Sequence, residues 1–236
     1  MYGFFDNAST TQIDDRVIEL MNRVLKQNYG NPSSIHRAGR EARIIIEQAR
    51  KKIAKLLRVS IGEIFFTSSA TEANNTILKN AVFDLGVKRI ISAPTEHPCV
   101  LNSLKFLSEK HLAVVKLLNV DKFGRIDLDQ LDDTLKQSSD KTLVSLMYAN
   151  NEIGTIHPIH EISRICKNHN SLVHCDAVQY IGKYPLDLPD LKLDFLSATA
   201  HKFHGPKGAA FFFMNSESIL SPLIHGGSQE RNMRAG

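Results

Sequence analysis

Short apolar runs alternate with helical stretches along most of this chain, and no other feature of the sequence restricts its fold as strongly. The seven runs are residues 63–66, 89–91, 113–117, 143–147, 172–174, 195–196 and 210–213. Strands that alternate with helices form a largely parallel sheet, because a helix both connects neighbouring parallel strands and covers one face of the sheet. The sequence therefore predicts an α/β fold with a mostly parallel seven-stranded sheet, flanked by helices, whose strands are buried on both faces.

Two amphipathic helices are expected ahead of the first strand. The first covers residues 13–28, where apolar residues recur at helical spacing. The second covers residues 35–57, and its apolar stripe consists of Ala42, Ile45, Ile46, Ala49, Ile53, Leu56 and Leu57. We expect the core to lie on that stripe, because an amphipathic helix buries its apolar side. A further helix is expected to begin near Asp127, after a surface turn.

The composition is ordinary for a soluble globular protein. The chain has 236 residues, of which 42% are hydrophobic and 23% are charged, and this length is enough for a substantial core. No apolar run approaches the roughly 18 residues that a membrane span needs. The formal charge of +4 comes from basic residues spread along the chain, without the basic clusters typical of nucleic-acid binding. We therefore expect neither a membrane nor a nucleic acid as a partner.

Three cysteines, Cys99, Cys166 and Cys175, lack the spacing of a metal site and are odd in number. Unpaired cysteines are typical of proteins in a reducing compartment. The first residues, Met1-Tyr-Gly-Phe-Phe-Asp6, do not have the charged and apolar pattern of a signal peptide. The sequence thus predicts a cytoplasmic protein without a metal site.

One lysine stands where a buried strand is expected to end. Lys202 lies in Ser197-Ala-Thr-Ala-His-Lys-Phe-His-Gly-Pro-Lys-Gly208, between two apolar runs. An amine held there is partly desolvated, which lowers its pKa and leaves more of it as the neutral nucleophile that forms Schiff bases with aldehydes. The alternative is a solvent-exposed lysine in a turn between two strands. Taken alone, the loop favours the alternative, because buried lysines are rare.

Two more polar segments follow expected strands. Thr67-Ser-Ser-Ala-Thr-Glu72 precedes a helix, and backbone N–H groups in the first turn of a helix favour an anion such as phosphate. The alternative is simple capping, since Ser69 and Glu72 have the spacing of a capping box, and both roles can coexist. Asp176 ends another strand, where ligands of a parallel sheet collect. A helix cap is the alternative for Asp176.

Eight blocks of the sequence follow one another in an order that is known from one enzyme family. Besides the lysine loop, they are Phe5-Asp-Asn-Ala-Ser-Thr-Thr11, Asn31-Pro-Ser-Ser-Ile-His36, Thr67-Ser-Ser-Ala-Thr-Glu-Ala-Asn-Asn75, Glu96-His-Pro98, Asn150-Asn-Glu-Ile-Gly154, Asp176-Ala-Val-Gln179 and Gly226-Gly-Ser-Gln-Glu-Arg231. This order resembles the cysteine desulfurases, pyridoxal-phosphate enzymes of fold type I related to the class-V aminotransferases. The resemblance covers nearly the whole chain, while the C-terminal third of the family is absent.

The resemblance implies a fold and a domain division. It implies the large domain of a fold-type I pyridoxal-phosphate-dependent transferase, which agrees with the predicted parallel sheet. Residues 1–14 would be an N-terminal segment that belongs to a small domain. Residues 15–236 would form the large domain that binds the cofactor.

The resemblance also implies pyridoxal 5'-phosphate as the cofactor. Lys202 would form the Schiff base, and Asp176 would meet the pyridine nitrogen and keep it protonated. Gln179 would donate a hydrogen bond to the phenolic oxygen of the ring. His97 would stack on the ring and relay protons, which suits an imidazole that titrates near neutral pH. A structural histidine in a turn is the alternative for His97, and His174 is given no role.

The remaining contacts implied by the resemblance concern the phosphate and the substrate. Ala70 and Thr71 would bind the phosphate at the start of a helix. Thr199 and His201 would complete the phosphate site from the other side, and Thr199 keeps the hydroxyl that many relatives have as serine. Asn151 would contact the cofactor and orient the substrate.

By the same resemblance, the activity is the removal of sulfur from L-cysteine. The products are L-alanine and a protein persulfide, which supplies iron–sulfur cluster assembly or other sulfur acceptors. The family forms homodimers, and a homodimer is expected here. The persulfide cysteine and the substrate-binding arginine of the family are absent from this sequence, so we expect the chain alone to form no persulfide. The alternatives are a selenocysteine lyase, an aminotransferase of the same fold type, or an inert cofactor-binding fragment.

None of the three cysteines is expected to replace the persulfide cysteine. Cys166 lies on the apolar side of a helix and Cys175 alternates away from Asp176, so both should be buried and inert. Cys99 begins a helix on a fixed framework. A sulfur-accepting cysteine must instead move between substrate and acceptor on a mobile loop.

Overall fold

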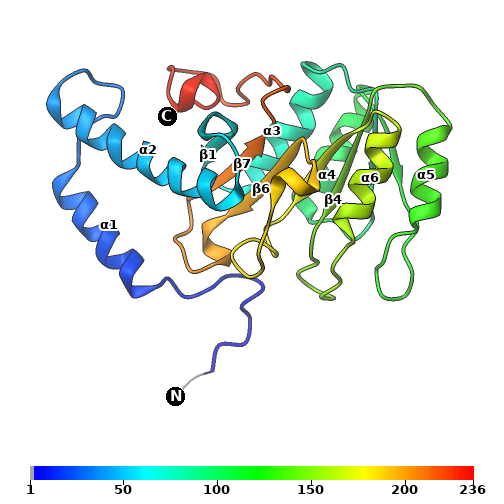
Figure 1. Cartoon of the computed structure of the whole chain (residues 1–236), viewed down its shortest axis with the longest axis horizontal. Helices are drawn as coiled ribbons and strands as arrows, with labels where there is room; N and C mark the ends of the chain where they lie inside the picture. Colours follow the sequence, from blue (N-terminus) through cyan, green and yellow to red (C-terminus); the bar gives the residue numbers. More distant parts are fainter. Residues whose placement is uncertain (1–2) are drawn as a thin grey trace.

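A seven-stranded β-sheet forms the centre of this computed structural model, which describes residues 3–236 (Figure 1). The strands are β1 (Ile64–Thr67), β2 (Arg89–Ser92), β3 (Val114–Leu117), β4 (Thr142–Met147), β5 (Leu172–Asp176), β6 (Phe195–Thr199) and β7 (Ala210–Met214). They lie in the order β1-β7-β6-β5-β4-β2-β3. Each apolar run of the sequence forms one of these strands, so the predicted seven-stranded α/β fold is confirmed.

The strand directions place the lysine loop at one particular edge of the sheet. The pairs β6–β5, β5–β4, β4–β2 and β2–β3 are all parallel, whereas β7 runs antiparallel to both β6 and β1. Met147, Asp176 and Ser197 are direct neighbours across β4, β5 and β6. Strand β7 returns beside β6 through the loop that contains Lys202. This loop therefore lies at the carboxyl edge of the parallel strands, where ligands collect.

Helices connect the strands and cover both faces of the sheet. They are α1 (Asp15–Gln27), α2 (Arg37–Leu57), α3 (Ala70–Phe83), α4 (Pro98–Glu109), α5 (Leu128–Lys136), α6 (Ile159–Asn168) and α7 (Leu188–Leu191), with the short 3₁₀ helices η1 (Ile61–Glu63), η2 (Ala200–Lys202) and η3 (Glu230–Asn232). Helix α5 begins as predicted, since the Asp127 carboxylate accepts the N–H of Gln130 at 3.0 Å. Within residues 3–236, no helix has the length and apolar character of a membrane span.

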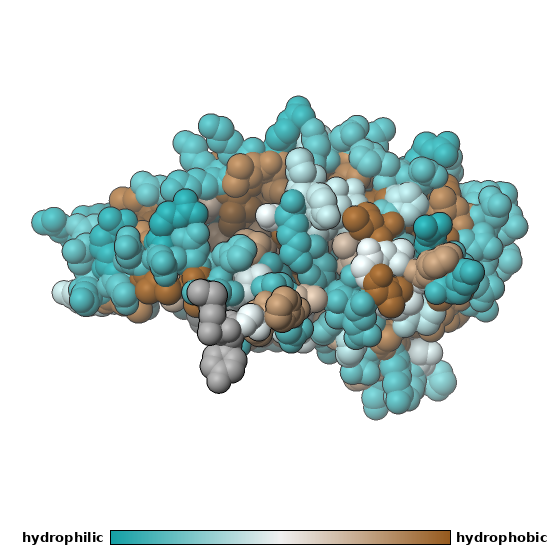
Figure 2. Space-filling model, turned by 90° about the horizontal axis from the view of Figure 1, so that it is seen from below, coloured by the Kyte–Doolittle hydropathy of each residue, from teal (hydrophilic) through white to brown (hydrophobic). Residues whose placement is uncertain are grey.

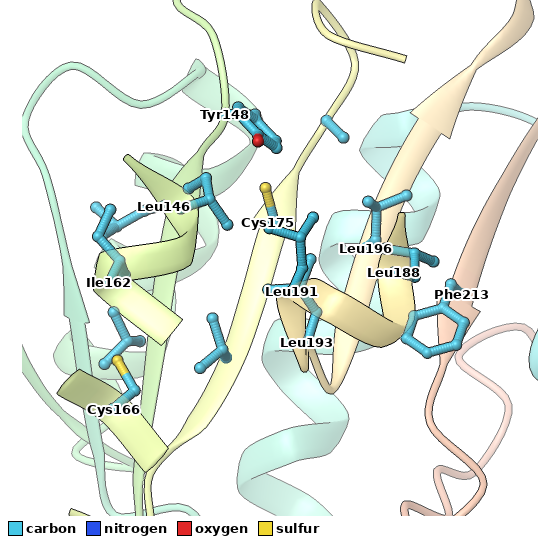
Figure 3. Close-up of a cluster of buried hydrophobic side chains, with 14 of the residues drawn as sticks. Leu146, Tyr148, Ile162, Cys166, Cys175, Leu188, Leu191, Leu193, Leu196 and Phe213 are labelled. Atoms are coloured by element: carbon cyan, nitrogen blue, oxygen red, sulfur yellow. The ribbon is translucent and has the colours of Figure 1, made fainter. Parts of the chain in front are cut away.

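Two apolar clusters fill the space between the sheet and its helices, one on each face. Helices α3 and α4 pack over one face, and α2, α5, α6 and α7 pack over the other. Successive side chains of β7 point to opposite faces of the sheet. Phe212 belongs to the first cluster, on the face of α3 and α4, and Phe211 and Phe213 belong to the second cluster, on the other face. Figure 3 shows the second cluster, with Cys175 of β5 and Cys166 of α6 among aliphatic side chains. Both cysteines are buried, as predicted.

One expectation about strand burial is wrong. Strand β3 is not buried on both faces, since the exposed fractions of Val114 and Leu117 are 56% and 48%. The physical reason is its position, because β3 is the last strand at one edge of the sheet and has a single neighbour, β2. A sequence pattern identifies a strand but not its place in the sheet order.

The predicted core stripe of α2 is also only partly correct. Ala42 and Leu57 are buried, whereas Leu56 has an exposed fraction of 77% and Ala49 is exposed as well. Helix α2 extends beyond the sheet (Figure 1), so only part of its length packs against β1. A charged residue, Arg50, takes a buried position on the helix instead.

The segment ahead of α1 crosses the carboxyl edge of the sheet beside the lysine loop. The N–H of Thr11 donates to the carbonyl of His201 at 2.8 Å, and the N–H of Asp14 donates to the carbonyl of His204 at 3.0 Å. The assignment of residues 1–14 to a small domain and of 15–236 to a large domain stays a prediction. Its first two residues lie outside the part of the chain that the structure describes.

Arg50 ties α2 to β1 and to the C-terminal segment. Its exposed fraction is 1%, and its Nη1 donates to the carbonyl of Ile64 at 2.7 Å. Its two Nη atoms also donate to the carboxylate of Glu230, at 2.5 and 2.9 Å. The same carboxylate accepts the N–H of Phe66 at 2.6 Å. The buried cation is therefore fully paired, which is the condition under which a buried charge is tolerated.

We expect Arg50→Ala to lower the free energy of unfolding by about 3–5 kcal/mol, because it leaves the largely buried Glu230 carboxylate without its cation. Equilibrium unfolding in urea measures this loss. Arg37→Ala is the matched control, since Arg37 lies on the same helix and pairs with Glu41 at the surface, where its side chain is 88% exposed. That control should cost no more than about 1 kcal/mol. Equal losses in the two variants would contradict the role given to Arg50.

Candidate functional site

A cavity of about 580 Å³ opens at the carboxyl edge of β4, β5 and β6. Its walls include every residue that the sequence indicated as a cofactor contact, namely Ala70, Thr71, His97, Asn151, Asp176, Gln179, Thr199, His201 and Lys202. The fold thus brings together side chains that are far apart along the chain. Their roles toward a ligand stay predictions.

Lys202 ends the 3₁₀ helix η2, directly after strand β6. Its Nζ donates to the carbonyl of Ala8 at 2.5 Å and to the carbonyl of Ser9 at 2.8 Å. Partial burial lowers the pKa of the amine, the positive charge of Lys183 lowers it further, and two nearby carboxylates act in the opposite direction. The lysine is therefore fixed in the cavity wall, and its ammonium group loses a proton more readily than that of an exposed lysine.

Gln179 links this lysine to a second one. Its Nε2 donates to the carbonyl of Ala8 at 2.7 Å, and the same carbonyl accepts from Lys202. Its Oε1 accepts from Nζ of Lys183 at 2.7 Å. Both ends of the Gln179 amide are thereby fixed, and Lys183 is close enough to act electrostatically on Lys202.

Asp176 is the last residue of β5, and its exposed fraction is 5%. Its Oδ2 accepts from Nδ2 of Asn74 at 2.8 Å, and its Oδ1 accepts the N–H of Val178 at 3.0 Å. Burial raises the pKa of Asp176, and the two hydrogen bonds and the charges of His97 and Lys202 oppose this rise. No helix begins at Asp176, so the alternative of a helix cap does not apply. The side chain is a fixed and desolvated acid in the cavity wall.

Helix α3 begins at the cavity with a capped N-terminus. The Ser69 hydroxyl accepts the N–H of Glu72 at 3.1 Å, so the predicted cap is present. The reciprocal half of a capping box is missing, because Oε2 of Glu72 accepts the N–H of Ser68 at 3.0 Å, not that of Ser69, and Oε1 pairs with Arg234 at 3.0 Å. The N–H groups of Ala70 and Thr71 have no acceptor within residues 3–236. Unpaired N–H groups at a helix start favour an anion, so capping and anion binding can coexist here.

His97 caps helix α4 and lines the cavity together with Cys99. The N–H of Cys99 donates to Nδ1 of His97 at 3.1 Å, and Sγ of Cys99 lies 3.0 Å from the same nitrogen. Because Nδ1 accepts this hydrogen bond, a neutral ring carries its hydrogen on Nε2. Burial raises the pKa of the Cys99 thiol to about 11, so the thiol stays protonated at neutral pH.

The remaining predicted residues are held less tightly. Nδ1 of His201 lies 3.2 Å from the Thr10 hydroxyl, and burial lowers the pKa of His201, which favours its neutral form. The Thr199 hydroxyl makes a long hydrogen bond of 3.4 Å to the carbonyl of Ala209. Asn151 makes no side-chain hydrogen bond with the other described residues, so its amide is available to a ligand.

Sequence reasoning missed the polar residues that surround Asp176 inside the protein. Asn74 and His174 are fully buried, although Asn74 lies within a block that the sequence had indicated. Glu96 is also buried; its Oε1 accepts the N–H of Met147 at 2.7 Å, and its Oε2 has no partner among the described residues. The available signal was a polar residue in an otherwise apolar strand, such as His174. The partner of such a residue cannot be read from the sequence.

The match to known proteins agrees with this site. Residues 3–234 match the aminotransferase class-V family. The chain belongs to this family. Within the class-V aminotransferase family, the chain is 46% identical to the cysteine desulfurase IscS of Dictyoglomus turgidum, over 99% of its own length and 59% of that protein. The chain therefore spans about three fifths of this curated relative.

Two solved structures extend the comparison. A NifS-like protein superimposes with a TM-score of 0.95 and 48% identity, over 100% of this chain and 65% of the other. SspA, solved in complex with cysteine, superimposes with a TM-score of 0.94 and 34% identity, over 100% of this chain and 68% of the other. The predicted fold-type I architecture is thus confirmed.

The cysteine desulfurases of the class-V aminotransferase family depend on pyridoxal phosphate, and the polar groups of the cavity fit this cofactor. The unpaired N–H groups at the start of α3 suit its phosphate. A lysine with a lowered pKa suits its aldehyde, and a buried carboxylate suits its pyridine nitrogen.

Proposed function

We propose that this chain carries the cofactor site of a pyridoxal-phosphate-dependent cysteine desulfurase. The whole enzyme would convert L-cysteine to L-alanine and transfer the sulfur atom to a cysteine thiol, and the resulting persulfide would supply iron–sulfur cluster assembly or another sulfur acceptor. The observation that carries the proposal is that Lys202, Asp176 and the start of α3 line one cavity. The identity to a cysteine desulfurase and the likeness to a protein solved with cysteine support the choice of substrate.

In this proposal the protein holds the cofactor from opposite ends. The N–H groups of Ala70 and Thr71 would bind the phosphate, because the helix dipole favours an anion there, and Thr199 and His201 would approach it from the other side. Asp176 would accept the hydrogen of the pyridine nitrogen. Bound in this way, pyridoxal phosphate supplies an electrophilic aldehyde and an electron-withdrawing ring.

The groups that move protons are then Lys202 and His97. The lowered pKa of Lys202 increases the fraction of neutral amine, which can attack an aldehyde and can take a proton from the α carbon of the substrate. His97 would stack on the ring and offer Nε2–H, because its Nδ1 accepts the N–H of Cys99. Gln179 and Asn151 would orient the ring and the substrate through their amide groups.

The three cysteines of this sequence are unsuited to accept the sulfur. Cys166 and Cys175 lie in the apolar core. Cys99 lines the cavity but belongs to a helix, and it accepts a hydrogen bond from Asn74 at 3.3 Å. With a pKa of about 11, its thiol contains little of the nucleophilic thiolate at neutral pH. The transfer would need a thiolate on a mobile segment of the whole enzyme.

Lys202→Ala should abolish covalent capture of pyridoxal phosphate without unfolding the protein, because a small apolar side chain is tolerated at a partly buried site. Reduction with borohydride followed by peptide mass spectrometry measures the capture. Lys207→Ala, in the same loop, is the matched control and should retain it. Unchanged capture in Lys202→Ala would show that the reactive lysine is misassigned. A wild-type protein that gains no visible absorbance with the cofactor would argue for an inert fragment.

The chain supplied with L-cysteine and pyridoxal phosphate should form no persulfide, for the reasons given for its three thiols. Intact-protein mass spectrometry under non-reducing conditions would detect the addition of one sulfur atom. Cys99→Ser serves as the control, since Cys99 is the thiol that lines the cavity. A gain of sulfur that disappears in this variant would identify Cys99 as the nucleophile and would contradict the proposal of a separate segment.

We further propose that the chain forms a homodimer in the cytoplasm. Helix α1 has no buried residue, and the exposed fractions of Ile18, Leu20 and Leu25 are 43%, 48% and 73%. Figure 2 shows small brown apolar patches between teal side chains in the left part of the molecule, which α1 and α2 form. A partner subunit would cover such surface. The three cysteines are free thiols, which supports a reducing compartment.

Light scattering at micromolar concentration should give a mass of about twice the 26.4 kDa of one chain. Leu25→Lys should shift the protein toward the monomer, because it places a charge on the exposed apolar face of α1. Phe123→Lys is the matched control, since Phe123 is 54% exposed in the turn ahead of α5, and α5 lies at the end of the molecule opposite α1 (Figure 1). A monomeric wild-type protein would contradict the dimer.

A further inference from the structure

A row of buried polar side chains leads from Asp176 into the interior of the sheet. Asn74, Ser145, His174 and Ser197 each have an exposed fraction of 0%. Nδ1 of His174 lies 2.8 Å from the Ser145 hydroxyl, and Nε2 of His174 lies 3.5 Å from the Ser197 hydroxyl. The Ser197 hydroxyl is 2.5 Å from Oδ1 of Asn74, whose Nδ2 reaches Asp176 at 2.8 Å. The row joins β4, β5, β6 and α3 to one carboxylate.

When Asp176 is ionised, the chemistry of these groups fixes the direction of every hydrogen bond in the row. An ionised carboxylate only accepts, so Asn74 must turn its NH₂ group toward Asp176 and its oxygen toward Ser197. An amide oxygen also only accepts, so the single hydrogen of the Ser197 hydroxyl points at Asn74. Nε2 of His174 can then only donate to Ser197. Its Nδ1 must accept from Ser145, because burial lowers the pKa of His174 to about 3 and a neutral imidazole carries one hydrogen.

All donors of the row therefore point toward Asp176. The row begins at a hydroxyl, passes through groups that each accept from the preceding member and donate to the next, and ends at a group that only accepts. Hydrogen bonds aligned in this way polarise one another and strengthen the last bond, which is the one to the carboxylate. The second N–H of Asn74 reaches Sγ of Cys99 at 3.3 Å, so the amide of Asn74 has a partner for each of its hydrogens.

We propose that Asn74, Ser197 and His174 form a positioning chain that keeps the Asp176 carboxylate ionised and in one orientation. This inference rests on the proposed function, because an ionised Asp176 is what a pyridine nitrogen in the cavity would require. Without the positioning chain, burial would favour the protonated form of Asp176. The residues act through Asp176 and do not themselves reach a ligand, since none of them lines the cavity.

Other ionisable groups lie around Asp176, and none of them is substituted in the variants of the positioning chain described below. Positive charge on His97 or Lys202 favours the ionised form of Asp176. Burial raises the pKa values of Glu96, Cys99 and Cys175, and the charge of Asp176 raises them further. A change in the titration of Asp176 is therefore assigned to the positioning chain only where a control substitution outside it has no such effect.

The experiment is a pH titration of Asp176 in the cofactor-free protein. The carboxyl ¹³C NMR signal of Asp176 is monitored in protein with labelled aspartates. The signal of Asp176 is identified by its loss in Asp176→Asn. Ser197→Ala and Asn74→Leu should each raise the proton affinity of Asp176, and Asn74→Leu should raise it about tenfold or more because it removes a hydrogen bond to the charged form. His174→Phe should have the same sign and a smaller effect, since it is one link further away.

Ser92→Ala is the matched control for Ser197→Ala. Ser92 is equally buried, and its hydroxyl donates to the backbone carbonyl of Ser145 at 2.8 Å. Ser92 therefore makes no hydrogen bond to the positioning chain. Its substitution should leave the titration of Asp176 unchanged. If Asn74→Leu does not fold, Ser197→Ala decides the question, because it removes one oxygen atom and leaves the packing intact. An Asp176 titration that is the same in Ser197→Ala and in Ser92→Ala overturns the proposal.

A second measurement separates this inference from the proposed function. In protein loaded with pyridoxal phosphate, Ser197→Ala should move the pH midpoint of the cofactor absorbance, whereas Ser92→Ala should not. If the titration of Asp176 changes as expected in the variants but the wild-type protein binds no cofactor, the proposed function is refuted and the effect of the positioning chain on Asp176 stands. If Lys202 captures the cofactor but no variant of the positioning chain changes the titration of Asp176, the positioning chain is refuted and the proposed function stands.

Discussion

The parallel register of β4, β5 and β6 is the constraint on which the rest of the site depends. It sets Met147, Asp176 and Ser197 side by side at the carboxyl edge of the sheet. Because side chains alternate between the faces of a strand, this register directs Asp176 and Ser197 to the face that α3 covers and Cys175 to the opposite face. A slip of one residue would exchange the two faces and remove the acid from the cavity.

Desolvation by the surrounding core gives these groups their chemistry. The same burial that stabilises the fold raises the pKa of Asp176 and of the Cys99 thiol and lowers that of Lys202 and His174. The protein compensates each buried charge with aimed hydrogen bonds. Asp176 receives donors from Asn74 and from a backbone N–H. The result is an acid and an amine in one cavity whose protonation differs from that of exposed groups.

Segments from both ends of the described chain complete this arrangement. The carbonyls of Ala8 and Ser9 accept from Lys202, and Glu230 neutralises the buried Arg50 behind β1. These contacts join residues more than 150 positions apart, so they form only when the sheet is assembled. They explain how α2 can bury the guanidinium of Arg50, a residue outside its predicted apolar stripe.

The sequence by itself determined the seven strands, most of the helices and nine of the residues that line the cavity. Strand-length apolar runs and helical periodicity are local properties, and the order of the motif blocks is specific enough to name a family. The tertiary structure decided what depends on neighbours. It made β3 an exposed edge strand, left Leu56 in solvent and buried Arg50. It also joined Asn74, Ser197 and His174 behind Asp176, because a hydrogen bond between distant residues depends on sheet order and register, which periodicity does not encode.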